Sequence, residues 1–168
     1  MPVTIKQLHP HFVGEVSGID LRQPLDAATF AELQAGIDRY GVLVFHGGTL
    51  SEEQQLDFAT RFGPIERSNN VLQPKDGRRL NTQLADISNL DENNKVLDAH
   101  DRRRMFALGN QLWHTDSSFK RIPAKYSLLH AHSVTPEGGQ TQFVDMRAVY
   151  EALPAAMQQK LEGLVAEH

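Results

Sequence analysis

The chain is 168 residues long, with 40% hydrophobic and 23% charged residues, which is enough for one globular domain with a substantial core. Its net charge of -4 excludes the strongly basic surface typical of proteins that bind nucleic acids or anionic membranes. The absence of cysteine excludes disulfides, cysteine-ligated zinc and iron–sulfur clusters, and slightly favours a reducing compartment.

The first residues, MPVTIKQLHPHF, lack the charged and apolar regions of a secretory signal peptide. No apolar run in the sequence approaches the roughly 18 residues that a transmembrane helix needs. We therefore expect a soluble, cytoplasmic protein with neither a membrane nor a nucleic acid as its partner.

The first part of the sequence predicts short strands separated by a helix. Residues 3–8 and 12–19 are predicted as strands because apolar and polar residues alternate along them. Residues 42–45 (VLVF) form a continuous apolar run closed by two glycines, which predicts a short buried strand.

Two helices in this part of the chain have clear signals at their ends. The first is predicted over residues 25–41, with Asp26 as its N-cap and a glycine where the helix should end. The second is predicted over residues 50–64, where Ser51 and Gln54 match the pattern of a capping box.

The second half is predicted to be mainly β, because short strands follow one another between turn residues, as in antiparallel sandwiches and barrels. Residues 66–82 have loop composition, residues 98–109 carry a charge cluster without a clear signal, and residues 147–168 are helical with a break at Pro154. We therefore predict a single domain of the α+β class, mainly β with flanking helices. The strands of the second half are predicted over residues 83–90, 111–115, 124–134 and 140–146.

The segment QLWHTDSSF (residues 111–119) contains the strongest chemical signal. If it is extended, His114 and Asp116 point to the same side and Thr115 to the other. An imidazole and a carboxylate that converge on one point supply two of the three ligands of a 2-His-1-carboxylate iron site. A bare H-x-D motif is also compatible with a histidine in the core and an aspartate that caps a turn.

Other polar residues are weaker candidates. Thr141 follows two glycines, and its hydroxyl could donate a hydrogen bond to a ligand carboxylate or simply reflect β propensity. Arg78 and Arg79 lie in the polar loop, where a guanidinium could pair with an anionic substrate or remain solvated. His130 and His132 share one face of a predicted strand, but exposure to solvent or to a polar interior is favoured over metal binding.

An ordered set of segments resembles the taurine/2,4-dichlorophenoxyacetate dioxygenase family, whose members are Fe(II)- and 2-oxoglutarate-dependent oxygenases. The resemblance runs through nearly all of the chain, and the middle and later segments look closest to the phenoxyacetate-type members. The segments that carry it are VLVFHG, FATRFGPIE, LADISN, NQLWHTDSSF, PAKYSLL, GGQTQFVDMRAVYEALP and KLEGLVAEH.

The resemblance implies a role for several of these residues. His114 and Asp116 would be two of the three iron ligands, and Thr141 would bind the distal carboxylate of 2-oxoglutarate. Asn110 matches the position at which the taurine-type members contact their substrate, and Arg78 is retained as a candidate partner for the substrate anion. The implied fold is a double-stranded β-helix, or jelly roll, with helices outside it, incomplete in this chain.

The resemblance also implies Fe(II) as cofactor, 2-oxoglutarate and molecular oxygen as co-substrates, and ascorbate as a candidate reductant. Oxidative decarboxylation of 2-oxoglutarate to succinate and CO2 would accompany hydroxylation of a small organic anion. The expected substrate is an aryloxyalkanoate such as 2,4-dichlorophenoxyacetate, whose hydroxylation beside the ether oxygen releases a phenol, a step in aromatic compound degradation. Members of this family commonly form homo-oligomers.

The third iron ligand and the arginine that binds 2-oxoglutarate match positions after residue 168, so we expect the chain to be the N-terminal part of the domain. Two alternatives remain open. The protein could be a dioxygenase of taurine or alkylsulfonates, which differs only in substrate. It could also be a truncated, catalytically silent fragment that acts as a binding or assembly module.

Overall fold

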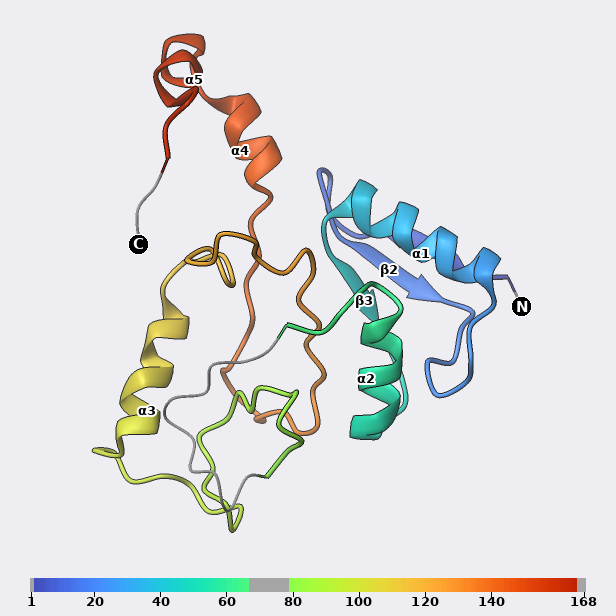
Figure 1. The fold of residues 1–168 in the computed structure, drawn as a ribbon, viewed down its shortest axis with the longest axis vertical. Coiled ribbons are helices and arrows are strands. Elements are labelled where there is room, and N and C mark those ends of the chain that lie inside the picture. The colour runs from blue at the N-terminus through green and yellow to red at the C-terminus, as the bar shows by residue number, and fades with distance from the viewer. Residues whose placement is uncertain (1, 67–78, 166–168) are drawn as a thin grey trace. The chain divides into compact units, whose positions relative to one another are not determined.

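The structure is a computed structural model that describes residues 2–66 and 79–165 (Figure 1). The chain divides into two compact units, one formed by residues 1–50 with 131–168 and the other by residues 51–130. The first unit contains the sheet and its crossing helix, and the second contains the segment with the H-x-D motif.

A three-stranded sheet organises the first unit. Strand β1 (Thr4–Gln7) is antiparallel to β2 (Gly14–Ser17), and β2 is parallel to β3 (Leu43–Phe45). Helix α1 (Ala27–Tyr40) connects β2 to β3 and lies along the sheet (Figure 1). These elements confirm the strands and the helix predicted for the first part of the chain.

Gly14 allows the crossing helix and the sheet to approach closely. A Cβ atom added at Gly14 would lie 2.6 Å from Ile5, 2.9 Å from Tyr40 and 3.0 Å from Leu43, all of them side-chain atoms. The same interface buries Leu33 of α1 completely. Because protein cores are close-packed, these three side chains occupy the space that any larger residue at position 14 would need.

The predicted helix ends are confirmed. The Asp26 side chain accepts a hydrogen bond from the backbone of the first turn of α1, and Gly41 ends the helix with a φ of 70°. Helix α2 (Glu52–Thr60) begins with the capping box predicted for Ser51 and Gln54, with both reciprocal hydrogen bonds formed. None of the helices in the described residues is long and apolar enough to cross a membrane.

The last part of the first unit is helical and joined to α1. Helices α4 (Met146–Ala152) and α5 (Ala155–Leu161) are separated at Pro154, as predicted. The Arg147 guanidinium donates hydrogen bonds to two backbone carbonyls at the C-terminal end of α1 and pairs with Asp145. This arginine therefore satisfies carbonyl groups that the helix itself leaves without partners. The guanidinium also lowers the pKa of Asp145 by hydrogen bonding to its carboxylate.

The second unit contains α2 and a short helix that the sequence did not predict. Helix α3 (Arg102–Ala107) begins at Asp101, whose carboxylate caps the first turn, and a 3-10 turn, η1 (Leu108–Gln111), follows it. A single backbone bridge between Leu90 and Val96 closes a turn over residues 91–95. The Asp101 cap thus starts a helix in a segment whose apolar residues are too irregularly spaced to predict one.

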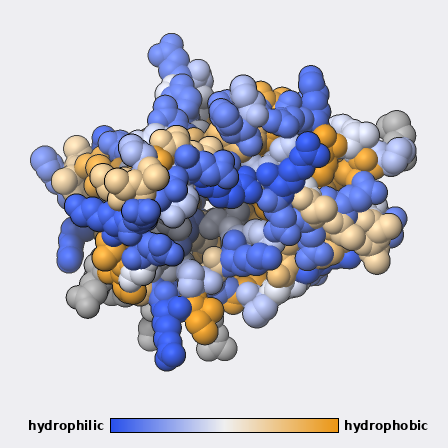
Figure 2. Space-filling view, turned by 90° about the horizontal axis from the view of Figure 1, so that it is seen from above, coloured by the Kyte–Doolittle hydropathy of each residue, from blue (hydrophilic) through white to orange (hydrophobic). Residues whose placement is uncertain are grey.

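Four strands predicted in the second half are wrong, because apart from the single bridge at Leu90 their residues pair with no other described strand. They were predicted over residues 83–90, 111–115, 124–134 and 140–146. A strand requires a neighbouring segment to accept and donate its backbone hydrogen bonds, and local alternation cannot provide one. Many apolar side chains of these segments are correspondingly exposed, and Figure 2 shows apolar residues (orange) at the surface on the face that it draws. Examples are Ile87, Leu112, Trp113, Leu129, Val134 and Phe143.

Replacement of Gly14 should test the close contact between α1 and the sheet. We expect Gly14→Ala to lower the free energy of unfolding by about 1–3 kcal/mol, since the new methyl group overpacks the interface. Urea denaturation followed by circular dichroism would measure the change. The control is Lys6→Ala on the exposed side of β1, which should shift stability by less than about 0.5 kcal/mol. Equal stability of both variants would contradict the packing argument.

Candidate metal site

His114 and Asp116 face each other in the second unit. The chain leaves η1 through Leu112, which is extended, and turns immediately after Asp116, where Ser117 adopts a left-handed φ of 56°. Nε2 of His114 lies 3.3 Å from Oδ1 of Asp116. The two groups converge as expected for an H-x-D motif, although the segment is an irregular chain entering a turn and not a strand.

His114 and Asp116 each form a hydrogen bond through their second polar atom, and these two bonds determine which atoms face each other. Nδ1 of His114 is 2.7 Å from the carbonyl oxygen of Leu112, and because a carbonyl only accepts, Nδ1 must carry the proton. The Ser127 hydroxyl donates to Oδ2 of Asp116 at 2.7 Å. Nε2 and Oδ1 are therefore the atoms of the pair that remain directed at each other.

The spacing between these two atoms suits a cation held between them. If the imidazole is neutral, Nε2 presents a lone pair to a carboxylate oxygen, and two acceptors at 3.3 Å need a shared positive charge. A proton on Nε2 would satisfy them as an ion pair. A divalent metal would also fit, because adjacent ligands of an octahedral ion with bonds of about 2.1 Å lie about 3 Å apart. Both side chains are about half exposed, so a metal can reach them.

A glutamate outside the motif holds the turn that follows it. One carboxylate oxygen of Glu66 accepts hydrogen bonds from the Ser117 hydroxyl at 2.8 Å and from the Lys120 ammonium. The other oxygen accepts from the backbone N–H of Ala124 at 3.2 Å. The hydrogen bond from Lys120, and then that from Ser117, lowers the pKa of Glu66. Sequence reasoning missed this residue because its partners lie 51 to 58 positions away.

Comparison with known proteins identifies the family. The family described as taurine catabolism dioxygenase TauD, TfdA matches residues 4–168. This chain belongs to that family. Over 168 residues it is 45% identical to the alpha-ketoglutarate-dependent 2,4-dichlorophenoxyacetate dioxygenase of Cupriavidus pinatubonensis, and covers 58% of that protein. Over 166 residues it is 36% identical to the (S)-phenoxypropionate/alpha-ketoglutarate-dioxygenase of Sphingobium herbicidovorans, and covers 52% of it.

A solved structure agrees with this assignment. The crystal structure of AAD-2 in complex with Mn(II) and N-oxalylglycine matches with a TM-score of 0.85 and 45% sequence identity. The match covers 96% of this chain and 54% of that one. The chain thus spans about half the length of the relatives it matches.

The remaining candidate residues of this TauD/TfdA-family chain lie in different places. Asn110 lies in η1, four residues before His114, and its side chain is exposed. Thr141 lies in an exposed segment without regular secondary structure in the first unit. Arg78 lies outside the described residues. Arg79 does not face solvent freely, because its guanidinium donates to the side chains of three residues, Asp86, Ser88 and Asn94.

The described residues supply two metal ligands and no complete set. Nowhere in residues 2–66 and 79–165 do three His, Cys, Asp or Glu side chains gather in a metal-binding arrangement. Metal binding by His114 and Asp116 therefore stays a prediction that needs a third ligand from elsewhere.

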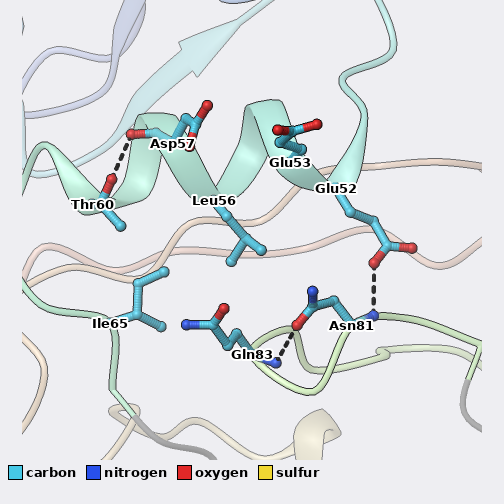
Figure 3. A pocket seen from close by; sticks show the side chains of 8 residues that line it. All are labelled: Glu52, Glu53, Leu56, Asp57, Thr60, Ile65, Asn81 and Gln83. Carbon is cyan, nitrogen blue, oxygen red and sulfur yellow. Dashed lines mark hydrogen bonds between the residues drawn. The ribbon is translucent and has the colours of Figure 1, made fainter.

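A separate hollow of about 510 Å³ lies beside α2 (Figure 3). Three carboxylates of α2 line it, and Glu52 accepts a hydrogen bond from the backbone N–H of Asn81. An anionic substrate would be repelled there, so we do not place the substrate in this hollow. Its lining residues are Glu52, Glu53, Leu56, Asp57, Thr60, Ile65, Asn81 and Gln83.

The contacts of Glu66 predict a pH-dependent contribution to stability. Because the pKa of Glu66 is lower in the folded state, its contribution is complete above the ordinary glutamate pKa of about 4.3 and is lost as the pH falls through the folded-state value. We expect Glu66→Gln to destabilise the protein at neutral pH, and the difference from wild type to shrink in acid. Urea denaturation across this pH range would measure it, with the exposed Glu32→Gln as control. A difference that stays constant with pH would contradict this role.

Proposed function

We propose that this chain is the N-terminal part of an Fe(II)- and 2-oxoglutarate-dependent dioxygenase that hydroxylates a small organic anion of the aryloxyalkanoate class. The observation that carries the proposal is the 3.3 Å approach of Nε2 of His114 to Oδ1 of Asp116, within a chain of the TauD/TfdA family. The fold that we propose for the complete domain is a jelly roll, of which this chain supplies part.

The donor set supports a divalent metal. One imidazole nitrogen and one carboxylate oxygen are available on the same side of the turn, and each side chain is oriented by a hydrogen bond through its other polar atom. Such outer hydrogen bonds are a regular feature of metal sites in proteins. Mn(II) and N-oxalylglycine, which AAD-2 binds, are chemically close to Fe(II) and 2-oxoglutarate. When bound, Fe(II) would activate molecular oxygen, which would act as the oxidant while 2-oxoglutarate is decarboxylated to succinate and CO2.

The residues of this chain would bind and orient the reactants. His114 and Asp116 would supply two of the protein ligands of the metal, and the positions without a protein ligand would be left for 2-oxoglutarate and oxygen. The Thr141 hydroxyl would donate a hydrogen bond to the distal carboxylate of 2-oxoglutarate, and Asn110 would contact the substrate. Such positioning holds the C–H bond to be oxidised close to the reactive centre.

The relatives support the substrate class. Two of them are named for 2,4-dichlorophenoxyacetate and (S)-phenoxypropionate, which are both aryloxyalkanoates. Hydroxylation beside the ether oxygen gives a hemiacetal that releases a phenol, so the reaction would serve aromatic compound degradation. We further propose a cytoplasmic homo-oligomer, with ascorbate as an accessory reductant.

Loss of the histidine should abolish catalysis by the full-length protein. We expect His114→Ala to lower iron-dependent succinate formation by more than the about 10–100-fold typical of changes outside the ligand shell. The assay would follow succinate together with phenol from aryloxyacetates and aryloxypropionates, or sulfite from alkylsulfonates. His100→Ala, at an exposed histidine outside the pair, is the control. Unchanged turnover in His114→Ala would contradict the proposal, and release of sulfite alone would assign the sulfonate class.

The hydroxyl of Thr141 should affect the co-substrate more than the metal. A hydrogen bond to a charged group contributes about 1.5–3 kcal/mol, so we expect Thr141→Val to raise the KM for 2-oxoglutarate about 10- to 100-fold. Thr141→Ser retains the hydroxyl and should stay near wild type. Steady-state kinetics at varied 2-oxoglutarate would measure both variants, and an unchanged KM in Thr141→Val would contradict this role.

A further inference from the structure

Ser127 lies eleven residues after Asp116 and contacts the carboxylate oxygen that does not face the histidine. Its hydroxyl donates to Oδ2 of Asp116 at 2.7 Å, while Oδ1 is the oxygen 3.3 Å from Nε2 of His114. The hydrogen bond therefore distinguishes the two oxygens of a group that is otherwise symmetric.

Both polar and apolar contacts hold the segment that carries Ser127 in place. Glu66 accepts a hydrogen bond from the backbone N–H of Ala124, three residues before Ser127. The ring of Tyr126 packs edge-on against Phe62, with centroids 5.3 Å apart, and Phe62 packs in the same way against Phe58 of α2. Edge-to-face contacts of this kind stabilise aromatic pairs. The Ser127 hydroxyl is thus presented from a fixed backbone.

Glu66 also fixes the other partner of this contact. The same carboxylate that holds Ala124 accepts a hydrogen bond from Ser117, the residue directly after Asp116. The Glu66 side chain therefore holds both segments that form the Asp116–Ser127 hydrogen bond. A small shift of either segment alone is opposed by these contacts.

The number of Asp116 oxygens that bind the metal determines how many metal positions remain for 2-oxoglutarate and oxygen. A metal with three protein ligands has three positions left, and a 2-oxo acid that chelates through two atoms leaves one for oxygen. A carboxylate that bound through both oxygens would take one of these positions. A hydrogen bond that retains Oδ2 keeps the carboxylate monodentate.

We propose that Ser127 is a positioning residue that holds Asp116 in a monodentate orientation toward the metal, with Oδ1 as the only ligating oxygen. This inference rests on the proposed function, because it assumes that His114 and Asp116 bind a metal. It adds to that function a specific residue and a specific coordination mode. Ser127 itself would touch neither the metal nor the substrate.

The test uses a pair of substitutions of nearly identical shape in the full-length protein. Ser127→Thr retains the hydroxyl and Ser127→Val removes it, and Ser127→Ala removes it without adding bulk. Mn(II) is the probe, and its dissociation constant is measured from the electron paramagnetic resonance signal of the free ion. The affinity of the Mn(II)-loaded protein for 2-oxoglutarate is measured by calorimetry. Ser118→Val, at the exposed serine of the same turn, is the matched control.

We expect Ser127→Val and Ser127→Ala to weaken Mn(II) binding about 10- to 100-fold, and Ser127→Thr and Ser118→Val to stay near wild type. The two variants without a hydroxyl should also bind 2-oxoglutarate more weakly once loaded with Mn(II), because the released carboxylate competes for a metal position. Melting temperatures close to wild type would show that the loss is not unfolding, and Ser127→Ala decides the matter if the valine variant unfolds.

His114→Ala distinguishes a failure of the proposed metal site from a failure of the proposed role of Ser127. If it loses Mn(II) binding while Ser127→Val and Ser127→Ala bind both ligands like wild type, the role of Ser127 is overturned and the proposed metal site stands. If His114→Ala binds Mn(II) as tightly as wild type, or if wild type does not bind Mn(II), both proposals are overturned.

Discussion

The carboxylate of Glu66 is the interaction on which the candidate site depends. It accepts hydrogen bonds from Ser117, Lys120 and Ala124, so a single side chain spans the turn after the H-x-D motif and reaches the segment that carries Ser127. A turn with a non-glycine residue at a φ of 56° is not a conformation that the chain adopts without support. Glu66 gives that support from the segment after α2, and it holds Ser117 directly beside Asp116.

The fold could be predicted where its signals are local. The caps of α1 and α2, the break at Pro154 and the three strands of the first unit depend on neighbouring residues and on apolar runs, and they were all predicted. The four strands predicted later in the chain are wrong because the alternation of apolar and polar residues is a feature of a single segment. A strand also needs a second segment to pair with its backbone. Helix α3 was not predicted because its first three residues are all arginine, its three apolar residues form no helical repeat, and Asp101 alone marks its start.

The candidate site divides in the same way. The convergence of His114 and Asp116 could be predicted from their spacing, since an extended backbone places alternate side chains on one side whether or not it belongs to a sheet. Ser127 and Glu66 could not be predicted, because they reach the motif across 11 and 51 residues through irregular segments that have no period. The convergence of the two proposed metal-binding atoms is thus encoded locally, whereas the contacts that orient them come from tertiary structure.

Charge pairing limits where an anionic substrate can bind. Arg79 donates to Asp86, and Arg103 pairs with Asp101 and Glu92, so both guanidinium groups are neutralised by nearby carboxylates. The hydrogen bond from Arg103 also lowers the pKa of Asp101, which keeps that carboxylate ionised and the pair intact. A guanidinium engaged in this way would have to exchange a fixed carboxylate for a mobile one, with little net gain. The proposed recognition of an aryloxyalkanoate carboxylate would therefore use groups other than these two arginines.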